Sequence, residues 1–530
     1  MRSIGGFKDF FILGVDVAVI VSKCSSFFLL ENIMKRILSL LLIAGAFSFA
    51  TPSWGEDVAP ATISDTQSEV VAPAATTAAP APAAEVVEVK VETAAPAPAP
   101  APAPAPEAPA ATEAAPQEPQ VNTADNGFIM ICAALVILMS IPGIALFYGG
   151  LVRSKNMLSV LAQTIVIFSL MFVLWAIYGY SLAFGANDNE TLQMVFGNLD
   201  KFLMLSVGPE AVNGTLSDLT FFSFQGAFAG ITACLIIGSF AERIKFSALL
   251  FVIFIWFTFS YIPLCHMVWG GGYIDSAWHS YDFAGGLVVH INAAICALVG
   301  AYFVGKRIGY GRELMSPHNM VMTMIGACLL WVGWFGFNAG SELTADGISA
   351  LAFANTCVAP AAAALAWMAA EWILFSRPSL LGACSGAVAG LVAITPACAF
   401  VSVGGALIIG LVAGFVCLWG IHGLKKLLNV DDSLDVFGVH GVGGITGALL
   451  TGIFCAPALG GVGFKEGWDS ILGQFTGQLV SVIICIVWCG IVSIVAFYLA
   501  DKLFGVRVAP DEEREGLDLT THGERAYNLM

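Results

Sequence analysis

Residues 282–292 read Asp-Phe-Ala-Gly-Gly-Leu-Val-Val-His-Ile-Asn, and residues 435–444 read Asp-Val-Phe-Gly-Val-His-Gly-Val-Gly-Gly. Both segments pass from an aspartate through phenylalanine and glycine to a Val-His pair, which puts His290 and His440 inside apolar runs. An ionisable side chain is costly in hydrocarbon and is a functional candidate by default. Taken singly, each histidine is equally well explained as an imidazole bonded to a nearby carbonyl. A pair in matching segments favours function.

Apolar runs long enough to cross about 30 Å of hydrocarbon follow one another from Asn126 onward. They predict an all-α polytopic membrane protein with eleven transmembrane helices, at 127–148, 158–183, 220–239, 246–265, 283–303, 319–338, 348–374, 379–397, 402–424, 434–456 and 473–500. His290 lies in the fifth helix and His440 in the tenth, so these helices are antiparallel. We therefore expect a 5+5 inverted repeat, with the histidines approaching from opposite faces.

These two histidines are the ionisable residues expected within spans. The other five are expected near interfaces or in loops, without a chemical role: His266, His279, His318, His422 and His522.

The composition agrees with a membrane protein, because 58% of the 530 residues are apolar and only 11% are charged. Lys and Arg number 22 against 38 Asp and Glu, and no basic cluster exceeds a few residues, which excludes a nucleic-acid-binding surface. The 13 cysteines mostly stand singly in apolar runs. Neither a disulfide scaffold nor a structural metal site is expected.

Two segments precede the first span. Residues 1–55 are predicted to be a signal peptide region, because Met34-Lys-Arg is followed by an apolar run and then by small residues at Ser53 and Gly55; translation could start at Met34. Residues 56–125 contain 13 of the 23 prolines and predict a disordered, acidic Ala/Pro-rich spacer. The helical domain is expected at 126–500 and a tail at 501–530.

Basic residues indicate the orientation in the membrane. Alternate loops and the tail carry 14 Lys and Arg, whereas the opposite loops carry only Lys201 and Lys465. Positive loops stay in the cytoplasm, so the N-terminus is expected outside and the C-terminus in the cytoplasm. With the signal peptide, this predicts a multi-pass protein of the inner (plasma) membrane. Acidic residues of the outer loops could attract cations, although ordinary solubilising charge explains them better.

Five more motifs accompany the two histidine segments: Ile141-Pro-Gly-Ile-Ala-Leu-Phe-Tyr-Gly-Gly150, Ala241-Glu-Arg-Ile-Lys-Phe246, His266-Met-Val-Trp-Gly-Gly271, Gly333-Trp-Phe-Gly-Phe-Asn-Ala-Gly-Ser341 and Gly382-Ala-Cys-Ser-Gly-Ala387. In this order they resemble the ammonium transporter (Amt/Mep/Rh) family, bacterial Amt-type. The resemblance runs from Asn126 to the C-terminus and leaves residues 1–125 outside it.

The resemblance implies a role for each of several side chains. Ammonium would bind in an outer vestibule at Phe228, Trp269 and Ser341. Two stacked rings, Phe228 and Phe337, would form a gate, and below it His290 and His440 would line the pore as a pair that shares a proton. Supporting roles fall to Asp282, which shapes the vestibule, Trp334, a further vestibule wall, and Asp435, which anchors the cytoplasmic end of the tenth span.

The resemblance further implies an ammonium transporter or channel that deprotonates ammonium and conducts ammonia, with the proton relayed separately. It implies a homotrimer surrounded by membrane lipid, and docking of a nitrogen-regulatory PII protein at the cytoplasmic tail. From its residues alone, the tail is a charged, solvated terminus. No cofactor, metal or enzymatic activity is implied.

Three alternatives remain. A membrane ammonium sensor with the same fold would usually append a folded signalling domain, and only residues 501–530 follow the last span. A Rh-like gas channel would not need the cation site that Trp269 and Ser341 imply. A membrane-embedded enzyme using the two histidines lacks a nucleophile or a third metal ligand nearby.

Overall fold

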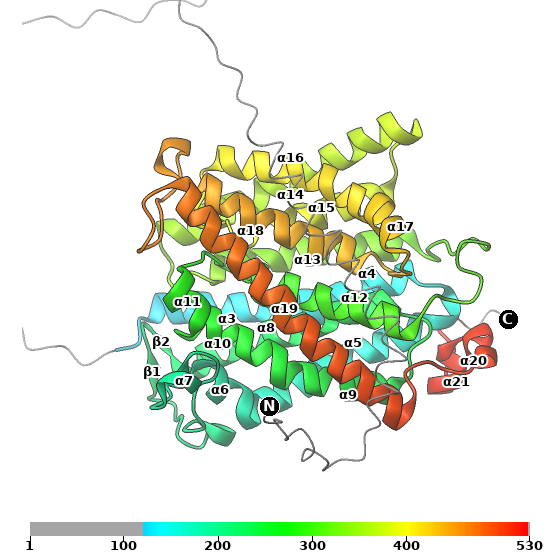
Figure 1. Ribbon diagram of the computed structural model, residues 1–530, viewed down its shortest axis with the longest axis horizontal. Coiled ribbons are helices and arrows are strands. Elements are labelled where there is room, and N and C mark those ends of the chain that lie inside the picture. Colours follow the sequence, from blue (N-terminus) through cyan, green and yellow to red (C-terminus); the bar gives the residue numbers. More distant parts are fainter. Residues whose placement is uncertain (1–119, 528–530) are drawn as a thin grey trace, which may run out of the picture. The chain divides into compact units, whose positions relative to one another are not determined.

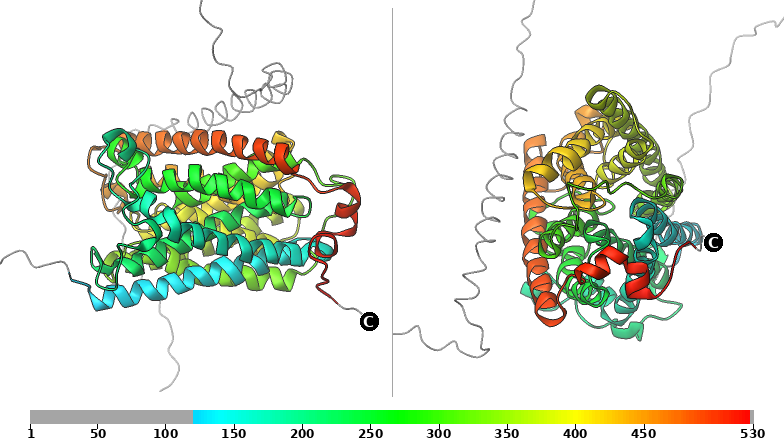
Figure 2. Two further views of the ribbon diagram at one scale, coloured as in Figure 1. Left: turned by 90° about the horizontal axis from the view of Figure 1, so that it is seen from below. Right: turned by 90° about the vertical axis from the view of Figure 1, so that its right-hand side faces the viewer.

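The computed structural model describes residues 120–527, which form a bundle of helices lying side by side (Figures 1 and 2). The predicted signal peptide region, 1–55, and all but the last residues of the predicted spacer, 56–125, lie outside the described residues.

The first half of the bundle contains α3 (Thr123–Leu138), η2 (Met139–Gly143), α4 (Ile144–Leu151), η3 (Ser154–Asn156), α5 (Met157–Leu174), η4 (Trp175–Gly179), α6 (Tyr180–Phe184), α7 (Glu190–Gln193), η5 (Phe202–Met204), β1 (Val212–Asn213), β2 (Leu216–Ser217), α8 (Asp218–Ile236), η6 (Ile237–Phe240), α9 (Phe246–Trp256), η7 (Phe257–Tyr261), α10 (Ile262–Trp269), α11 (Tyr273–Trp278), η8 (Gly286–Ile291) and α12 (Asn292–Val304). Strands β1 and β2 pair in antiparallel fashion.

The second half contains α13 (Met320–Gly340), α14 (Gly347–Phe375), α15 (Leu380–Ile394), α16 (Val403–Trp419), η9 (Gly420–Leu424), α17 (Lys425–Leu428), η10 (Phe437–Gly441), α18 (Val442–Phe454), η11 (Pro457–Leu459), α19 (Ile471–Phe504), α20 (Pro510–Glu515) and α21 (Leu517–His522).

Within residues 120–527, ten continuous helical segments are long and apolar enough to cross a membrane. They correspond to ten of the eleven predicted spans. The remaining one, predicted at 379–397, is the shorter apolar helix α15 (Leu380–Ile394). The fold is therefore that of an all-α polytopic membrane protein.

Single π-helical turns interrupt several spans. In η2 the turn contains Pro142, whose missing N–H removes one helical hydrogen bond and makes a wider turn tolerable. Two further turns of this kind, η8 and η10, carry His290 and His440 respectively. The segments that sequence analysis selected are thus local irregularities in otherwise regular helices.

Close helix crossings hold the bundle together. On α16, a Cβ atom at Gly410 would lie 2.2 Å from the carbonyl oxygen of Ala359 on α14, so the crossing needs glycine at that position. Helix α19 runs diagonally across one face and packs on α9, α12 and α18 (Figure 1). The most buried spans are α8 with η6 and η8 with α12, which form the centre.

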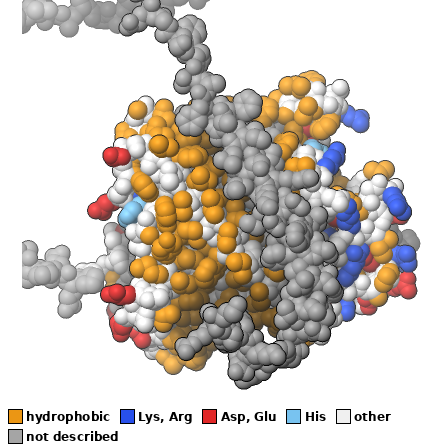
Figure 3. All heavy atoms as spheres, in the orientation of Figure 1, with side chains coloured by type: hydrophobic (Ala, Val, Ile, Leu, Met, Phe, Trp, Pro, Cys, Tyr) orange, Lys and Arg blue, Asp and Glu red, His pale blue; other side chains and the backbone are white. Residues whose placement is uncertain are grey.

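The two ends of the molecule differ in charge (Figure 3). On the face shown, a broad band of hydrophobic side chains separates an end with Asp and Glu from an end with Lys and Arg beside some Asp and Glu; we call these the acidic end and the basic end. Such a band fits helices that lie in hydrocarbon with their loops in water.

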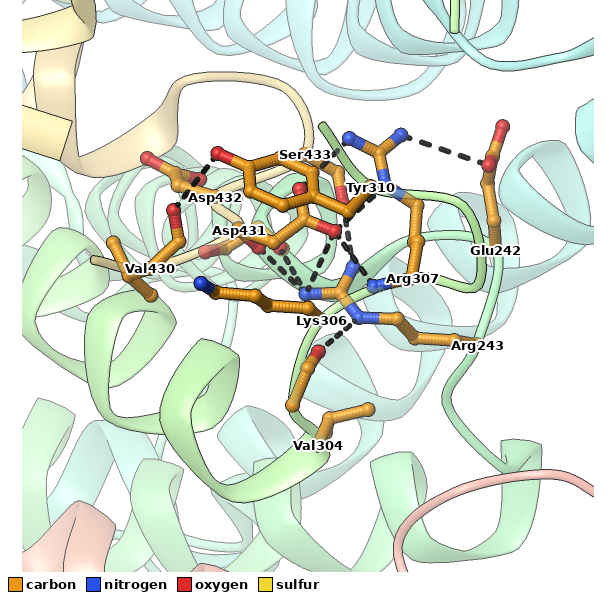
Figure 4. A network of polar contacts seen from close by, with 12 residues as sticks. Glu242, Arg243, Val304, Lys306, Arg307, Tyr310, Val430, Asp431, Asp432 and Ser433 are labelled. Atoms are coloured by element: carbon orange, nitrogen blue, oxygen red, sulfur yellow. Dashed lines mark hydrogen bonds and ion pairs between the residues drawn. The ribbon is translucent and has the colours of Figure 1, made fainter. Parts of the chain in front are cut away.

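Buried ion pairs join the loops at the basic end, in a set that we call the Arg307 network: Arg153, Glu242, Arg243, Arg307 and Asp431. Figure 4 shows the last four of these residues. Arg307 Nη2 lies 2.8 Å from Asp431 Oδ1, and Arg307 Nη1 lies 3.6 Å from Glu242 Oε2. The fully buried guanidinium of Arg243 donates to the carbonyl oxygen of Asp431 at 2.6 Å. These contacts connect the loops before α9, α13 and η10.

The tail is docked on the bundle, so its interpretation as a solvated terminus is wrong. Leu517 N donates to Asn156 Oδ1 at 2.8 Å, and Ser159 N donates to Asp518 Oδ1 at 2.8 Å. Leu517 and Asp518 are buried in these contacts, and the hydrogen bonds join α21 to η3 and the start of α5. Partners far apart in the sequence gave no local signal of this docking.

The expectation that His290 and His440 are the ionisable residues within spans is also wrong. His266 is fully buried in α10, because that helix continues beyond the predicted span end at residue 265. Glu371 is buried near the end of α14, where its carboxylate accepts a hydrogen bond from the backbone N–H of Ser379, the N-cap residue of α15, at 2.7 Å.

Asp431→Asn is expected to lower the free energy of unfolding by about 3 kcal/mol, because it leaves the buried Arg243 and Arg307 without their carboxylate. Burial raises the pKa of Asp431, but the hydrogen bond from Arg307 and the charge of Arg243 outweigh it, so the net shift is downward. The carboxylate's stabilising effect is therefore complete above the aspartate pKa of the unfolded chain and is lost as pH falls through the folded-state pKa.

Thermal unfolding in detergent measures the effect. The control is Asp511→Asn, since Asp511 forms an exposed pair with Arg514 and its loss should cost less than about 0.5 kcal/mol. Equal losses in the two variants would contradict a structural role for the Arg307 network.

Candidate functional site

The turn that carries His290 is capped by a carboxylate. Asp282 accepts hydrogen bonds from four successive backbone N–H groups, those of Gly285, Gly286, Leu287 and Val288. These are the donors that the start of a helix leaves without partners, and a negative charge is favoured there. Gly285 has a φ of +112°, which strongly favours glycine. The residues before His290 therefore fix the position of η8.

The turn that carries His440 is capped by Asp432, whose carboxylate accepts from Val436 N at 3.1 Å and from Phe437 N at 2.8 Å. Asp432 stands eight residues before His440, as Asp282 stands eight residues before His290. Sequence analysis matched Asp435 to Asp282 instead, but Asp435 has a φ of +61° and its partly exposed side chain pairs with Lys425. The equal spacing to histidine is the signal that identifies Asp432.

The two turns bring the histidines into contact. His290 Nδ1 and His440 Nδ1 are 3.3 Å apart, and the ring planes are inclined by 25°. Both side chains are buried. A Cβ atom at Gly444 would lie 3.3 Å from the Cβ of His290 and press on it, so glycine there leaves room for the pair.

Aromatic rings extend from the histidine pair toward the acidic end. Phe228 and Phe337 are stacked, with ring centroids 4.1 Å apart and an interplanar angle of 13°. The ring of Trp269 lies nearly perpendicular to that of Phe228 at a centroid distance of 6.1 Å, and the ring of Phe337 lies 6.0 Å from that of His290. The rings of Trp269, Phe228, Phe337, His290 and His440 thus form a continuous row, in which only Trp269 is partly exposed.

Two cavities meet this row. One of about 10 Å³ touches both histidines and is otherwise lined by apolar and aromatic side chains, with room for about one water molecule. The other, of about 240 Å³, lies beyond His440 at the basic end, with Arg307, Lys425 and Asp435 in its wall. The narrow apolar space therefore lies beside both histidines, and its wall shares Phe147, Tyr148, Val388 and His440 with the wall of the wider polar space.

A sequence profile described as Ammonium Transporter Family matches residues 127–527. The chain is 42% identical to an ammonium transporter of Bacillus subtilis (strain 168), over 76% of this chain and 98% of that protein. It is also 40% identical to ammonium transporter Amt1 of Archaeoglobus fulgidus, over 76% of this chain and 98% of that protein. The chain belongs to the ammonium transporter family. It is therefore a membrane transport protein rather than an enzyme.

Solved structures agree with this membership. Mep2 of Saccharomyces cerevisiae superposes with a TM-score of 0.66 at 32% identity, covering 74% of this chain and 91% of that one. A protein described as a sensor Amt protein superposes with a TM-score of 0.68 at 28% identity, covering 75% of this chain and 97% of that one.

The other predicted residues of this family member lie along the same row. Trp269 donates its indole N–H to the carbonyl oxygen of Asp282 at 2.8 Å. Ser341 Oγ donates to the carbonyl oxygen of Phe337 at 2.8 Å. Trp334, expected in the vestibule wall, instead stacks on His290 at 5.4 Å and is buried on the inner side of the phenyl pair. Residues 120–527 contain no cluster of His, Cys, Asp or Glu arranged to hold a metal ion.

Asp432→Asn is expected to reduce ammonium transport and to lower stability by about 2 kcal/mol, because an amide offers buried backbone donors fewer acceptors than a carboxylate does. The matched variant Asp435→Asn should cost less than about 1 kcal/mol, since it loses only a partly exposed ion pair. Transport assays and thermal unfolding compare the two. A larger effect from Asp435→Asn would reverse the assignment of the cap.

Proposed function

We propose that the protein recruits ammonium at an outer vestibule formed by Phe228, Trp269 and Ser341 and that ammonium loses its proton near the phenyl pair, with the histidine pair as the proton acceptor. Ammonia then passes the phenyl pair and the histidine pair, while the proton is relayed separately through the histidines. The observation that carries this proposal is the continuous row of rings that ends in the 3.3 Å contact between His290 and His440.

Recruitment needs groups that attract a small cation. The ring faces of Trp269 and Phe228 offer cation–π interactions, and the hydroxyl oxygen of Ser341 can accept one N–H of ammonium. Trp269 is suited to this because its indole N–H is already bonded to Asp282 and its ring stays beside Phe228.

Selectivity against potassium follows from the lack of oxygen ligands in the passage. The small cavity beside the histidines has no polar lining atoms other than those of aromatic and histidine side chains, so a potassium ion would lose its water without oxygen ligands in return. Ammonium can lose a proton and continue as a neutral molecule. A narrow apolar passage thus distinguishes two cations of similar size and charge.

The histidine pair suits a proton relay. A neutral imidazole donates from one ring nitrogen and accepts at the other, so one proton can lie between the two Nδ1 atoms. His290 Nε2 is buried and has no hydrogen-bond partner among the described residues, which leaves it available to a passing molecule. The wider cavity beyond His440 provides an exit.

The architecture supports an inverted repeat of spans 1–5 and 6–10. Each half supplies one capped π-helical turn, with the capping aspartate eight residues before the histidine. The basic end, where the Arg307 network and the tail lie, is proposed to face the cytoplasm, with the N-terminus outside an inner membrane. Eleven crossings place the two termini on opposite sides, α15 counting as one.

The proposed assembly is a homotrimer, with membrane lipid on the remaining apolar surface and a nitrogen-regulatory PII protein on the cytoplasmic face. The docked tail supports the PII partner, because Glu513 of α20 accepts from Ile308 N, next to Arg307 in the wall of the exit cavity.

A sensor of the same fold is the second candidate, favoured by the similarity to the protein described as a sensor Amt protein. The Rh-like gas channel remains the third. Ammonium-evoked current in proteoliposomes separates them: a transporter gives saturable current, a gas channel gives ammonia flux without current, and a sensor gives neither.

The proposal predicts saturable current in the wild type and its loss in His290→Ala. An unchanged selective current in that variant would contradict the mechanism.

Phe228→Ala or Phe337→Ala is expected to raise the permeability of potassium relative to ammonium by about tenfold or more, because either change opens the stacked pair to hydrated ions. Bi-ionic reversal potentials in the same liposomes measure the ratio. Phe335→Ala is the control, since Phe335 lies on the same helix and stacks outward on Phe353. Equal permeability ratios in the gate variants and the control variant would contradict a gating role for the phenyl pair.

A further inference from the structure

His266 has an arrangement that the transport mechanism above does not use. Its imidazole is fully buried in α10, with Nδ1 2.9 Å from the carbonyl oxygen of Ala183 and Nε2 2.8 Å from that of Gln193. Carbonyl oxygens only accept hydrogen bonds, and a neutral imidazole has a single N–H. Both contacts are hydrogen bonds only if both ring nitrogens carry hydrogen.

The two carbonyl groups lie at helix ends. Ala183 is in the last turn of α6, which ends the long helix Ser154–Phe184, and Gln193 is the last residue of α7. The last carbonyl oxygens of a helix lack helical donors and carry partial negative charge, so a cation is stabilised there. Gly185 N and Gly197 N satisfy the carbonyl groups of Ser181 and Leu182, and the ring of His266 satisfies the next one.

No carboxylate is bonded to this imidazole within residues 120–527. The elements around it, namely α6, α7, η7, α11 and η8, and α10 itself carry these titratable groups: Tyr180, Glu190, Tyr261, Cys265, Tyr273, Asp275 and His290. Tyr180 donates to Asp218, and Asp275 forms an ion pair with Lys465. Backbone dipoles are therefore the groups that would offset a charge on His266.

The same backbone carries the vestibule tryptophan. The carbonyl oxygen of His266 accepts from Gly270 N at 2.9 Å and from Gly272 N at 3.1 Å, and Tyr273 N donates to Met194 O at 2.9 Å. Trp269 stands inside this hydrogen-bonded turn, three residues after His266. Elements α6, α7, α10 and α11 lie together at one end of the bundle (Figure 1).

We propose that His266 is held as an imidazolium that ties the ends of α6 and α7 to α10, and so acts as a positioning residue for Trp269. A neutral ring would keep one N–H and release one carbonyl group, which would loosen the turn that carries the indole. This inference rests on the proposed recruitment of ammonium at Trp269.

Nitrogen NMR of protein with ¹⁵N-labelled histidine rings, reconstituted in liposomes, tests the charge directly. At neutral pH both ring nitrogens of His266 are expected to be protonated, and the signals are assigned by their loss in His266→Gln. His318 is the internal reference, because its ring contacts one carbonyl oxygen and the Tyr527 hydroxyl, which can donate, so a neutral ring satisfies both. A neutral His266 at that pH would overturn the proposal, whatever the transport activity.

Transport kinetics test the positioning role. His266→Gln is expected to raise the ammonium concentration for half-maximal current about tenfold while changing the maximal current less than about twofold, because charge-assisted hydrogen bonds are lost outside the conducting row. His279→Gln, which also removes an imidazole at the acidic end, is the control and should leave both values unchanged.

The two measurements separate the outcomes. A wild type without ammonium current would refute the proposed function and, with it, the positioning role, whereas the NMR result would still decide the charge of His266. A normal wild-type current with equal half-saturation in both glutamine variants would refute the positioning role alone. Should His266→Gln fail to fold, His266→Asn supplies both the assignment of the His266 NMR signals and the kinetic comparison.

Discussion

The contact between His290 and His440 imposes the strictest requirement on this fold, because two polar rings from different halves of the chain must meet where water hardly enters. Each histidine lies in a π-helical turn. The first backbone N–H groups of that turn donate to an aspartate eight residues before the histidine. Glycine at 444 then lets the turns approach closely. Burial makes unbonded polar groups costly, so the geometry of the pair depends on these caps.

Contacts at the basic end also hold the His440 turn in place. The loop that begins the His440 turn is fixed by Asp431 in the Arg307 network and by hydrogen bonds from Ser433 N and Leu434 N to the end of the third span. The tail reaches this region through Glu513, whose carboxylate accepts from Ile308 N at 2.7 Å, one residue after Arg307. Tail, loops and histidine turn are thus joined by consecutive contacts at the basic end.

The spans and the histidine pair could be predicted from the sequence, since long apolar runs and matched Asp-to-His segments are local patterns. Other features could not, because they depend on partners far away in the chain. Sequence comparison favours Asp435 over Asp432, because the residues next to Asp435 match better. In the structure Asp435 has a left-handed backbone conformation and its side chain pairs with Lys425. The ring of Trp334 stacks on His290, and the charged tail forms hydrogen bonds with the buried residues Asn156 and Ser159. The expectation of an interfacial His266 followed from a predicted span that ends at residue 265, whereas the helix continues to Trp269.

The central claim is that the two imidazoles act as one unit that shares a proton. A double-variant cycle of ammonium-evoked current tests it most directly, with His290→Ala, His440→Ala and the double variant measured in the same liposomes. If the rings act together, the double variant should lose no more current than the more severe single variant. Losses that multiply across the two sites would show that each histidine acts alone and would contradict the account.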